Sequence, residues 1–223
     1  MRPVERSEIL DYVTYTDRRN EIRASALQAK SERRILVGEY LTFLFENRET
    51  VRYQVQEMMR VERIVKEADI LHELDTYNEL IHPAGTVGCT LLIGIDDEAE
   101  RDEKLHAWLG LNDHIYATMP DGSRRTPTWD PRQVGDTRLS SVQYLAFGFG
   151  SDAPTALGVD LKGAEAETSL SEAQRGALAI DLTERSPDHL SSSLADRRTP
   201  IDSTDLGDPS TATMVCDNHV THA

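Results

Sequence analysis

The sequence predicts an α+β fold: a mixed, mostly antiparallel sheet packed by an N-terminal helix and a central helix pair, with a disordered C-terminal tail. Short runs of β-branched, aromatic and other apolar residues, separated by turn residues, are typical of strands. Longer segments have apolar residues at helical spacing. This patterning stops near residue 182, so we expect a single domain over 1–182. We expect disorder over 183–223, where little apolar surface could offset the cost of ordering the chain.

The first third of the domain predicts one helix and two strands. Apolar and small residues recur at helical spacing over 3–32, and Ser7 can act as the N-cap. Two short strands, over 33–38 and 39–46, meet at Gly38. One face of the second strand is wholly apolar and the other only partly polar, so we expect the sheet to be covered on both sides.

The central helix pair begins at Asn47. Its side chain can cap the first backbone amides, and Glu49 lies in the first turn, where the helix dipole favours an anion. A helix over 47–66 then places one apolar stripe, made of Val51, Val55, Met58, Val61 and Val65. A second helix follows over 68–80, after a break that we place near Asp69, a residue that tolerates turn geometry.

The second half of the domain predicts further strands around one helix. Residues 86–95 form a near-continuous apolar run, which indicates a central strand with Cys89 as part of the core. Acidic residues crowd the start of a helix over 97–110. A hairpin follows, with strands over 114–119 and 124–129. The remaining segments are a strand over 141–149, an acidic loop or insertion over 151–168, a short helix from Ser169 or Ser171 to Leu178, and a final strand over 179–182.

Charge and composition exclude several classes of partner. The chain has 24 Lys and Arg against 39 Asp and Glu, a net charge of −15, which disfavours nucleic acid or an anionic membrane and favours cationic or protein partners. No apolar run approaches the roughly 20 residues of a membrane helix. The N-terminus lacks a secretory signal, and Cys89 and Cys216 form no disulfide framework. We therefore expect a cytoplasmic location.

Two polar residues interrupt the apolar stripe of the central helix. Helical geometry places Gln54 and Glu62 within it, with Glu62 beside Val55 and Met58. A buried carboxylate without a partner is costly, so Glu62 should meet an Arg, a metal or a hydrogen-bond donor. One interpretation is a structural ion pair with Arg33 or Arg34, and the other is an acid/base or ligand carboxylate that lines a pocket.

The opposite side of this helix carries a second polar set. Arg52, Gln56, Arg60 and Arg63 lie there at near-helical spacing. This pattern is typical of a solvated face with pairs within the helix, and the alternative is an anion site.

Metal-ligand spacing occurs in two places. Asp69 and His72 have the i, i+3 spacing of helical carboxylate–histidine sites, and Glu62 would share their face if the two helices were continuous. The expected break between the two helices would move Glu62 away from the face that Asp69 and His72 share. Cys216, His219 and His222 form a second run in the tail. We expect neither to be a metal site and expect no cofactor, since glycine-rich nucleotide loops, a nucleophile elbow and a Cys-x-x-Cys pair are also absent from the sequence.

The segments LFENRETVRYQVQEMMRVERI and ELDTYNELI resemble the bacterial family called domain of unknown function 3501, and the resemblance extends from the N-terminal helix to about Leu182. It implies no established reaction. Genes of this family often neighbour those of rubrerythrin-like and iron–sulfur oxidoreductase proteins, which implies a redox or peroxide-stress context. The motif positions are Glu46, Asn47, Arg48, Arg52, Tyr53, Gln54, Gln56, Glu57, Met58, Glu62, Tyr77 and Asn78.

Two functions therefore compete. The first is a non-catalytic accessory or docking partner of a redox or oxidative-stress system, whose acidic faces bind another protein. The second is a small enzyme or metal-binding protein that uses Glu62, with Glu57 or with Asp69 and His72, in a cleft between the central helix and the sheet. The candidate binding residues are Arg48, Arg52, Gln54, Glu57, Glu62, Tyr77 and Asn78.

Overall fold

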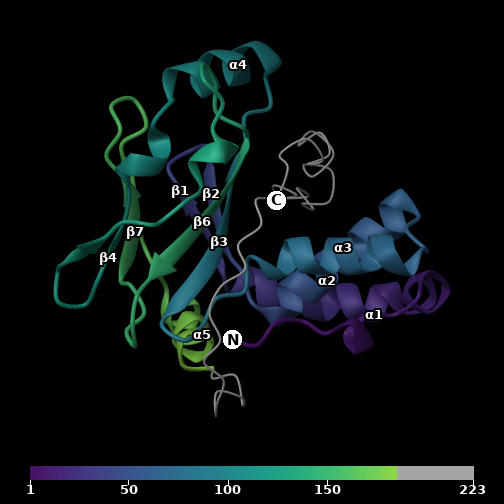
Figure 1. Ribbon diagram of the computed structural model, residues 1–223. Helices are drawn as coiled ribbons and strands as arrows, with labels where there is room; N and C mark the ends of the chain where they lie inside the picture. Colours follow the sequence, from purple (N-terminus) through teal and green to yellow (C-terminus); the bar gives the residue numbers. More distant parts are fainter. Residues whose placement is uncertain (185–223) are drawn as a thin grey trace, which may run out of the picture.

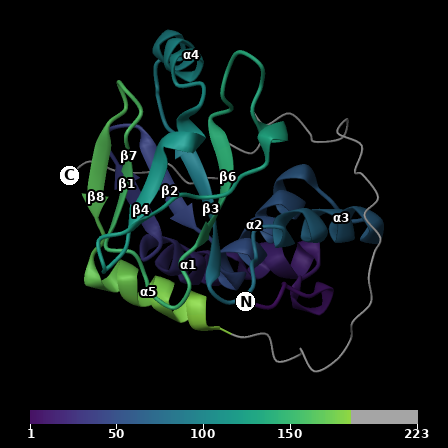
Figure 2. The same ribbon diagram turned by 60° about the vertical axis from the view of Figure 1, so that its left-hand side comes forward.

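The computed structural model of the chain describes residues 1–184 and has the expected α+β architecture (Figure 1). Within these residues, two four-stranded sheets, A and B, lie face to face, and a helical layer covers the other face of sheet A. The helical layer consists of α1 (Tyr12–Ser31), α2 (Arg48–Glu62) and α3 (Glu67–Asn78). Two more helices, α4 (Glu98–Ala107) and α5 (Glu172–Thr183), close the upper and lower ends of the space between the sheets (Figure 2).

The strands divide into two antiparallel sheets where the sequence predicts one. Sheet A has the order β1-β2-β3-β6, and sheet B has the order β5-β4-β7-β8. The strands of sheet A are β1 (Arg34–Val37), β2 (Leu41–Phe45), β3 (Thr86–Ile93) and β6 (Val142–Gly148), and those of sheet B are β4 (Ile115–Thr118), β5 (Arg124–Arg125), β7 (Ala156–Val159) and β8 (Ala166–Ser169). Alternation reveals where a strand lies but not which strand it pairs with, so the division is invisible in the sequence.

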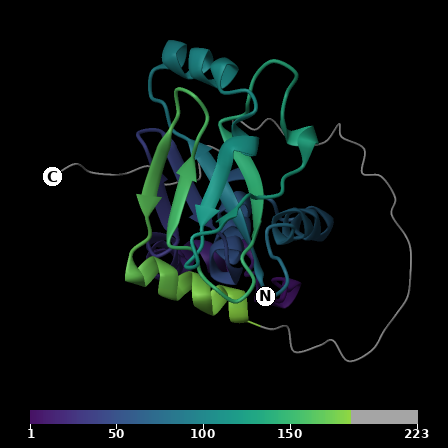
Figure 3. The ribbon, with the colours of Figure 1, turned by 90° about the vertical axis from the view of Figure 1, so that its left-hand side faces the viewer.

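The expectation of an acidic loop over 151–168 is wrong, because this segment contains β7 and β8. Figure 3 shows them in sheet B, above α5. The small residues that suggest a loop have a packing reason. A Cβ at Gly158 would lie 2.6 Å from Cζ of Tyr116, so the glycine lets the tyrosine ring lie across the neighbouring strand.

The buried apolar residues form two separate cores. The larger lies between the sheets, and its aromatic centre is Phe45, Phe147 and Phe149, with ring centroids 5.2 to 6.0 Å apart. These edge-tilted and offset contacts suit aromatic rings. The smaller core lies within the helical layer, where α2 and α3 pack on Val4 and Ile9 from the first ten residues.

Several helix ends differ from the predicted ones. The first α-helix begins at Tyr12, because the Asp11 carboxylate accepts from two backbone amides, whereas Ser7 lies in a separate 3-10 turn. Residues 1–10, here called the N-terminal strap, are otherwise non-helical. Ser171 caps α5 as expected, but α5 continues through 179–182, so the final strand is wrong. The tail over 185–223 lies outside the described residues.

The helical layer touches sheet A at a point where only glycine fits. A Cβ at Gly88 of β3 would lie 2.2 Å from the backbone oxygen of Leu80, just beyond α3. Real atoms do not approach so closely, so the glycine sets how near the end of α3 comes to the sheet.

Side chains cover both outer edges of sheet A. On β1, the Thr168 hydroxyl donates to the Leu36 oxygen at 2.8 Å, and the Gln174 amide donates to the Arg34 oxygen at 2.7 Å. On β6, the Gln133 amide pairs with both backbone groups of Tyr144, at 2.7 and 2.9 Å.

Among residues 1–184, no helix combines the length and the apolar character needed to cross a membrane.

Candidate functional site

The helix α2 begins where the sequence predicts, at Asn47. Its carboxamide accepts from the Thr50 amide at 3.0 Å, and the Thr50 hydroxyl accepts from the Asn47 amide at 2.9 Å. This reciprocal pair satisfies two amides that the helix leaves open. Just before it, Glu46 is 7% exposed and its two oxygens accept from the hydroxyls of Thr50 and Thr90, at 2.5 and 2.8 Å. The start of α2 is therefore fixed to the middle of sheet A.

Glu57 is the buried carboxylate of the helical layer. It is 2% exposed and accepts from the Tyr15 hydroxyl at 2.5 Å and from two nitrogens of Arg19 at 2.7 and 2.9 Å. Arg60 adds a contact at 3.1 Å. Although burial by itself raises the pKa of Glu57, these donors together lower it to about 2. Glu57 thus joins α1 to α2 as an anion.

Two side-chain amides hold the N-terminal strap. Gln56 accepts from the Leu10 amide at 2.8 Å and donates to the Leu10 oxygen at 3.1 Å. Asn78 does the same for Val4, at 2.8 and 3.0 Å. The expectation of a solvated face is therefore wrong for Gln56, which is 2% exposed, because the strap covers that side of the helix. Each amide supplies one donor and one acceptor, as a neighbouring strand would.

The arginines of α2 have different surroundings. Arg48 is half-buried and donates to the Glu8 carboxylate of the strap at 2.6 Å, whereas its Nε is buried without a partner among the described residues. Arg52 is half-buried, and Arg63 is exposed. Arg60 belongs to the Glu57 cluster. The exposed Arg63 and the pair of Arg60 with Glu57 within the helix agree with the expected solvated face, whereas Gln56 does not.

The prediction that Glu62 is buried is wrong. Glu62 is exposed, and so are Val61 and Val65 of the expected stripe, at 44% and 70%. The stripe is buried only as far as Met58, because the last turn of α2 extends beyond its neighbours and the chain then turns at Arg63. Helical periodicity predicts which side of the helix a residue faces, but not how far along the helix the neighbouring segments cover that side.

Arg33 also has a different partner from the expected Glu62. It forms a buried bidentate pair with Asp181 of α5, at 2.7 and 3.0 Å. Burial raises the pKa of Asp181, and the Arg33 guanidinium opposes this effect. The pair fixes α5 beneath both sheets.

A small cleft lies between the outer face of sheet A and the helical layer, as the second functional hypothesis requires. Its volume is about 30 Å³, and it brings together the predicted residues Gln54 and Tyr77. Lys30 and Glu46 line it as well, both less than 10% exposed. Glu62 is not among the lining residues.

Lys30 is a lining residue that was not predicted from the sequence. The residue lies in the last turn of α1, and its ammonium is 5.0 Å from the centroid of the Tyr53 ring. One signal could have revealed it: Ala26 and Ala29 are buried on the same helix, and helical spacing places residue 30 on their face.

The proposed metal ligands do not meet. Glu62, Asp69 and His72 are all exposed, and the break that separates the helices lies at Arg63, so Asp69 is inside α3 rather than at the turn. In the described part of the chain, no three His, Cys, Asp or Glu side chains are placed to hold a metal ion. The run of Cys216, His219 and His222 lies outside that part.

Comparisons with known proteins give a family and a fold. A family model described as "Protein of unknown function (DUF3501)" matches residues 3–182. A crystal structure of a protein of unknown function from Burkholderia pseudomallei K96243 is similar, with 26% sequence identity and a TM-score of 0.75. The similarity covers 81% of this chain and 100% of that one. The search of curated proteins found no match.

Proposed function

Because the chain belongs to the DUF3501 family, whose description names no activity, we propose a function from its own geometry: a non-catalytic docking protein. The partner binds at the distal end of the helical layer, defined here as the surface of Val13, Val61, Arg63, Val65 and Lys66. The assignment of this partner to a redox or oxidative-stress system in the cytoplasm rests on the family resemblance alone.

Exposed apolar side chains are the observation that carries this proposal. Val13, Val61 and Val65 are 66%, 44% and 70% exposed. Tyr15 and Arg19 of α1 both contact Glu57, so the N-terminal half of α1 lies beside the C-terminal half of α2, and Figure 1 shows both at the end farthest from the sheets. Apolar side chains gathered on one projecting end are typical of a protein-binding surface.

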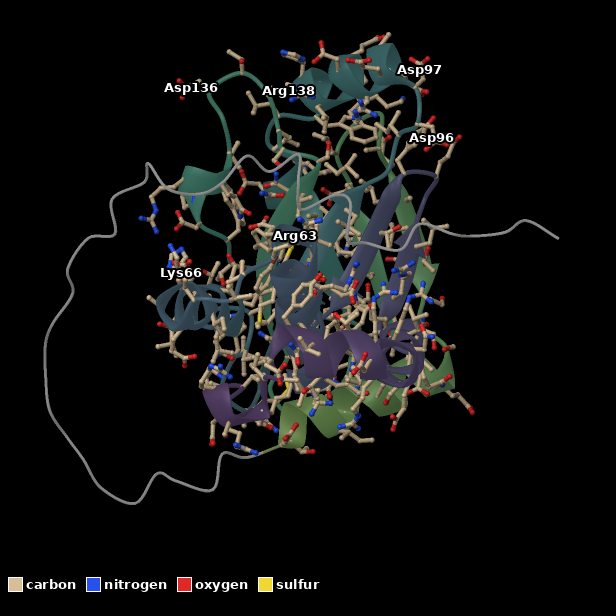
Figure 4. All side chains as sticks on the ribbon, turned by 90° about the vertical axis from the view of Figure 1, so that its right-hand side faces the viewer. Arg63, Lys66, Asp96, Asp97, Asp136 and Arg138 are labelled. Carbon is tan, nitrogen blue, oxygen red and sulfur yellow. The ribbon has the colours of Figure 1, made fainter. Side chains whose placement is uncertain are left out.

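Charges of both signs surround these apolar side chains. Arg63 and Lys66 face the viewer in Figure 4, which looks onto the distal end, and Glu62, Glu67 and Asp69 are exposed beside them in the sequence. The exposed apolar side chains, rather than a net charge, are therefore the reason to assign docking to this end.

The backbone at Arg63 supports the same surface. Arg63 has φ 57° and ψ 40°, and it is the one non-glycine residue of the described chain with positive φ. Glycine usually occupies this position after a helix, because other residues lose about 1 kcal/mol there. An exposed arginine kept in a strained conformation is consistent with a binding role for its side chain.

The family motif residues are used inside the molecule. Gln56 and Asn78 hold the strap, and Glu57 joins two helices. These contacts stabilise the helical layer that presents the distal end. The alternative of an enzyme or metal-binding protein built on Glu62 loses its support, because this carboxylate is exposed and does not line the cleft.

Binding of purified rubrerythrin-like and iron–sulfur proteins tests the proposal. We expect one of them to bind the full chain with a Kd on the order of 10 µM, and Val65→Asp to weaken binding by at least about tenfold. Leu36→Asp is the matched control, since Leu36 is 55% exposed on β1, away from the distal end. Absence of binding, or equal loss with both variants, would contradict the proposal.

A further inference from the structure

The N-terminal strap is attached to the helical layer through side chains. In the described part of the chain, no backbone–backbone hydrogen bond joins residues 2–10 to later residues. Gln56 instead pairs with both main-chain groups of Leu10, at 2.8 and 3.1 Å. Asn78 pairs in the same way with Val4, at 2.8 and 3.0 Å. These four bonds use only the peptide groups of the strap, so they do not depend on which side chains it carries.

The strap covers an apolar surface of α2 and α3, here called the strap-binding surface. Val4 and Ile9 of the strap are 3% and 4% exposed. They form one buried cluster with residues of both helices, namely Val51, Val55, Met59, Ile70 and Leu74. In peptide recognition, main-chain hydrogen bonds supply affinity and the spacing of the buried side chains supplies specificity. Here that spacing is two apolar residues five positions apart.

Charged groups flank this surface, and the strap satisfies them incompletely. Arg6 donates to the Glu67 carboxylate at 2.8 and 2.9 Å, and Arg48 donates to the Glu8 carboxylate at 2.6 Å. The buried Nε of Arg48, however, has no hydrogen-bond partner among the described residues. A buried donor without an acceptor is unfavourable, so the strap is an imperfect ligand for this surface.

We propose that the strap-binding surface is a peptide-binding site and that the strap is its resident ligand. The partner ligand is an extended segment of another protein, with two apolar residues spaced as Val4 and Ile9 are. A basic and an acidic residue between them would meet Glu67 and Arg48. Such a segment replaces the strap by exchanging equivalent apolar contacts and main-chain hydrogen bonds. This site uses other residues than the distal end, so the inference does not depend on the docking function.

A strap variant of the full chain makes the surface available for the test. Val4→Asp should release the strap, because a carboxylate is unfavourable at a buried apolar position. The probe is a synthetic peptide of residues 1–10 with fluorescein at its C-terminus, and fluorescence anisotropy measures its binding. We expect a Kd on the order of 10 µM for Val4→Asp. The native chain should bind at least about tenfold more weakly, because its own strap competes at high effective concentration.

Two glutamine variants, each combined with Val4→Asp, give the test its specificity. Gln56→Ala should weaken peptide binding by at least about fivefold, because it removes both bonds to Leu10. Gln28→Ala is the matched control, since Gln28 is exposed on α1 and bonds only to Glu32 of the same chain segment. No saturable binding to a folded Val4→Asp chain, or equal affinity with and without Gln56→Ala, would overturn the inference.

Hydrogen exchange of the native chain decides the question if Val4→Asp does not fold. A strap that leaves its surface by itself opens more often than the whole molecule unfolds. The Leu10 amide should therefore be protected at least about a hundredfold less than the amide of Leu91, which is buried in the middle of β3. Equal protection of the two amides would show that the strap leaves only on global unfolding, and the inference would be wrong.

Discussion

Replacing Glu57 by Gln should remove a large part of the stability of the helical layer. Glu57 has a pKa of about 2 in the folded chain against 4.5 for a free side chain. A difference of about 2.5 pKa units at 1.36 kcal/mol each corresponds to about 3 kcal/mol near pH 7. Breaking a buried ion pair costs a similar 3–5 kcal/mol or so. The lower value applies here, because the side chains of Arg19 and Arg60 are 29% and 32% exposed and can regain water.

The pH dependence follows from the direction of the shift. Because the folded pKa is lowered, the contribution of Glu57 is present above pH 4.5 and lost as the pH falls toward 2. The stability difference between the native chain and Glu57→Gln should therefore shrink by roughly 1 kcal/mol between pH 5 and pH 3.5.

Urea unfolding at several pH values measures this difference. Glu62→Gln on the same helix is the control, and because Glu62 is exposed it should change stability by less than about 0.5 kcal/mol. If Glu57→Gln behaves like this control at pH 7, the Glu57 cluster contributes little and the reasoning is refuted.

Three further outcomes are expected. Arg63→Gly should raise the free energy of unfolding by about 1 kcal/mol, since glycine adopts positive φ without strain. If urea unfolding shows no increase in this free energy, the backbone at Arg63 is not strained. Gly88→Ala should lower the stability by about 3 kcal/mol or more, because its Cβ would meet the Leu80 oxygen, and a native melting temperature would contradict that approach. Asn78→Ala should lower the free energy of unfolding by about 1–2 kcal/mol and speed hydrogen exchange of the Val4 amide. Unchanged exchange would mean that the strap is held without the Asn78 side chain.

Features encoded by local chemistry were predictable from the sequence. The start of α2 at Asn47, the turn at Gly38 and the buried strand with Cys89 each depend on residues within a few positions of one another. Periodicity placed Gln54 within the apolar stripe and the family resemblance singled out Tyr77, and both residues line the small cleft beside sheet A.

Features that depend on distant partners were not predictable. Gln56 looked solvated because the covering strap lies 46 positions away in the chain, and Arg33 pairs with Asp181 across 148 positions. Glu62 looked buried because its angle on the helix is right, but the covering layer ends before it. In each case the missing information is which segment lies opposite, and this depends on the packing of the whole chain.

The covered edges of sheet A limit how this molecule can associate. An incoming strand needs a row of open backbone donors and acceptors as a template, and fibrils grow by repeating that step. Thr168 and Gln174 occupy the carbonyls of β1, and Gln133 occupies both groups of Tyr144 on β6. Another strand can pair with either edge only if these side-chain hydrogen bonds first break. A partner must therefore meet this sheet through side chains rather than join it as another strand.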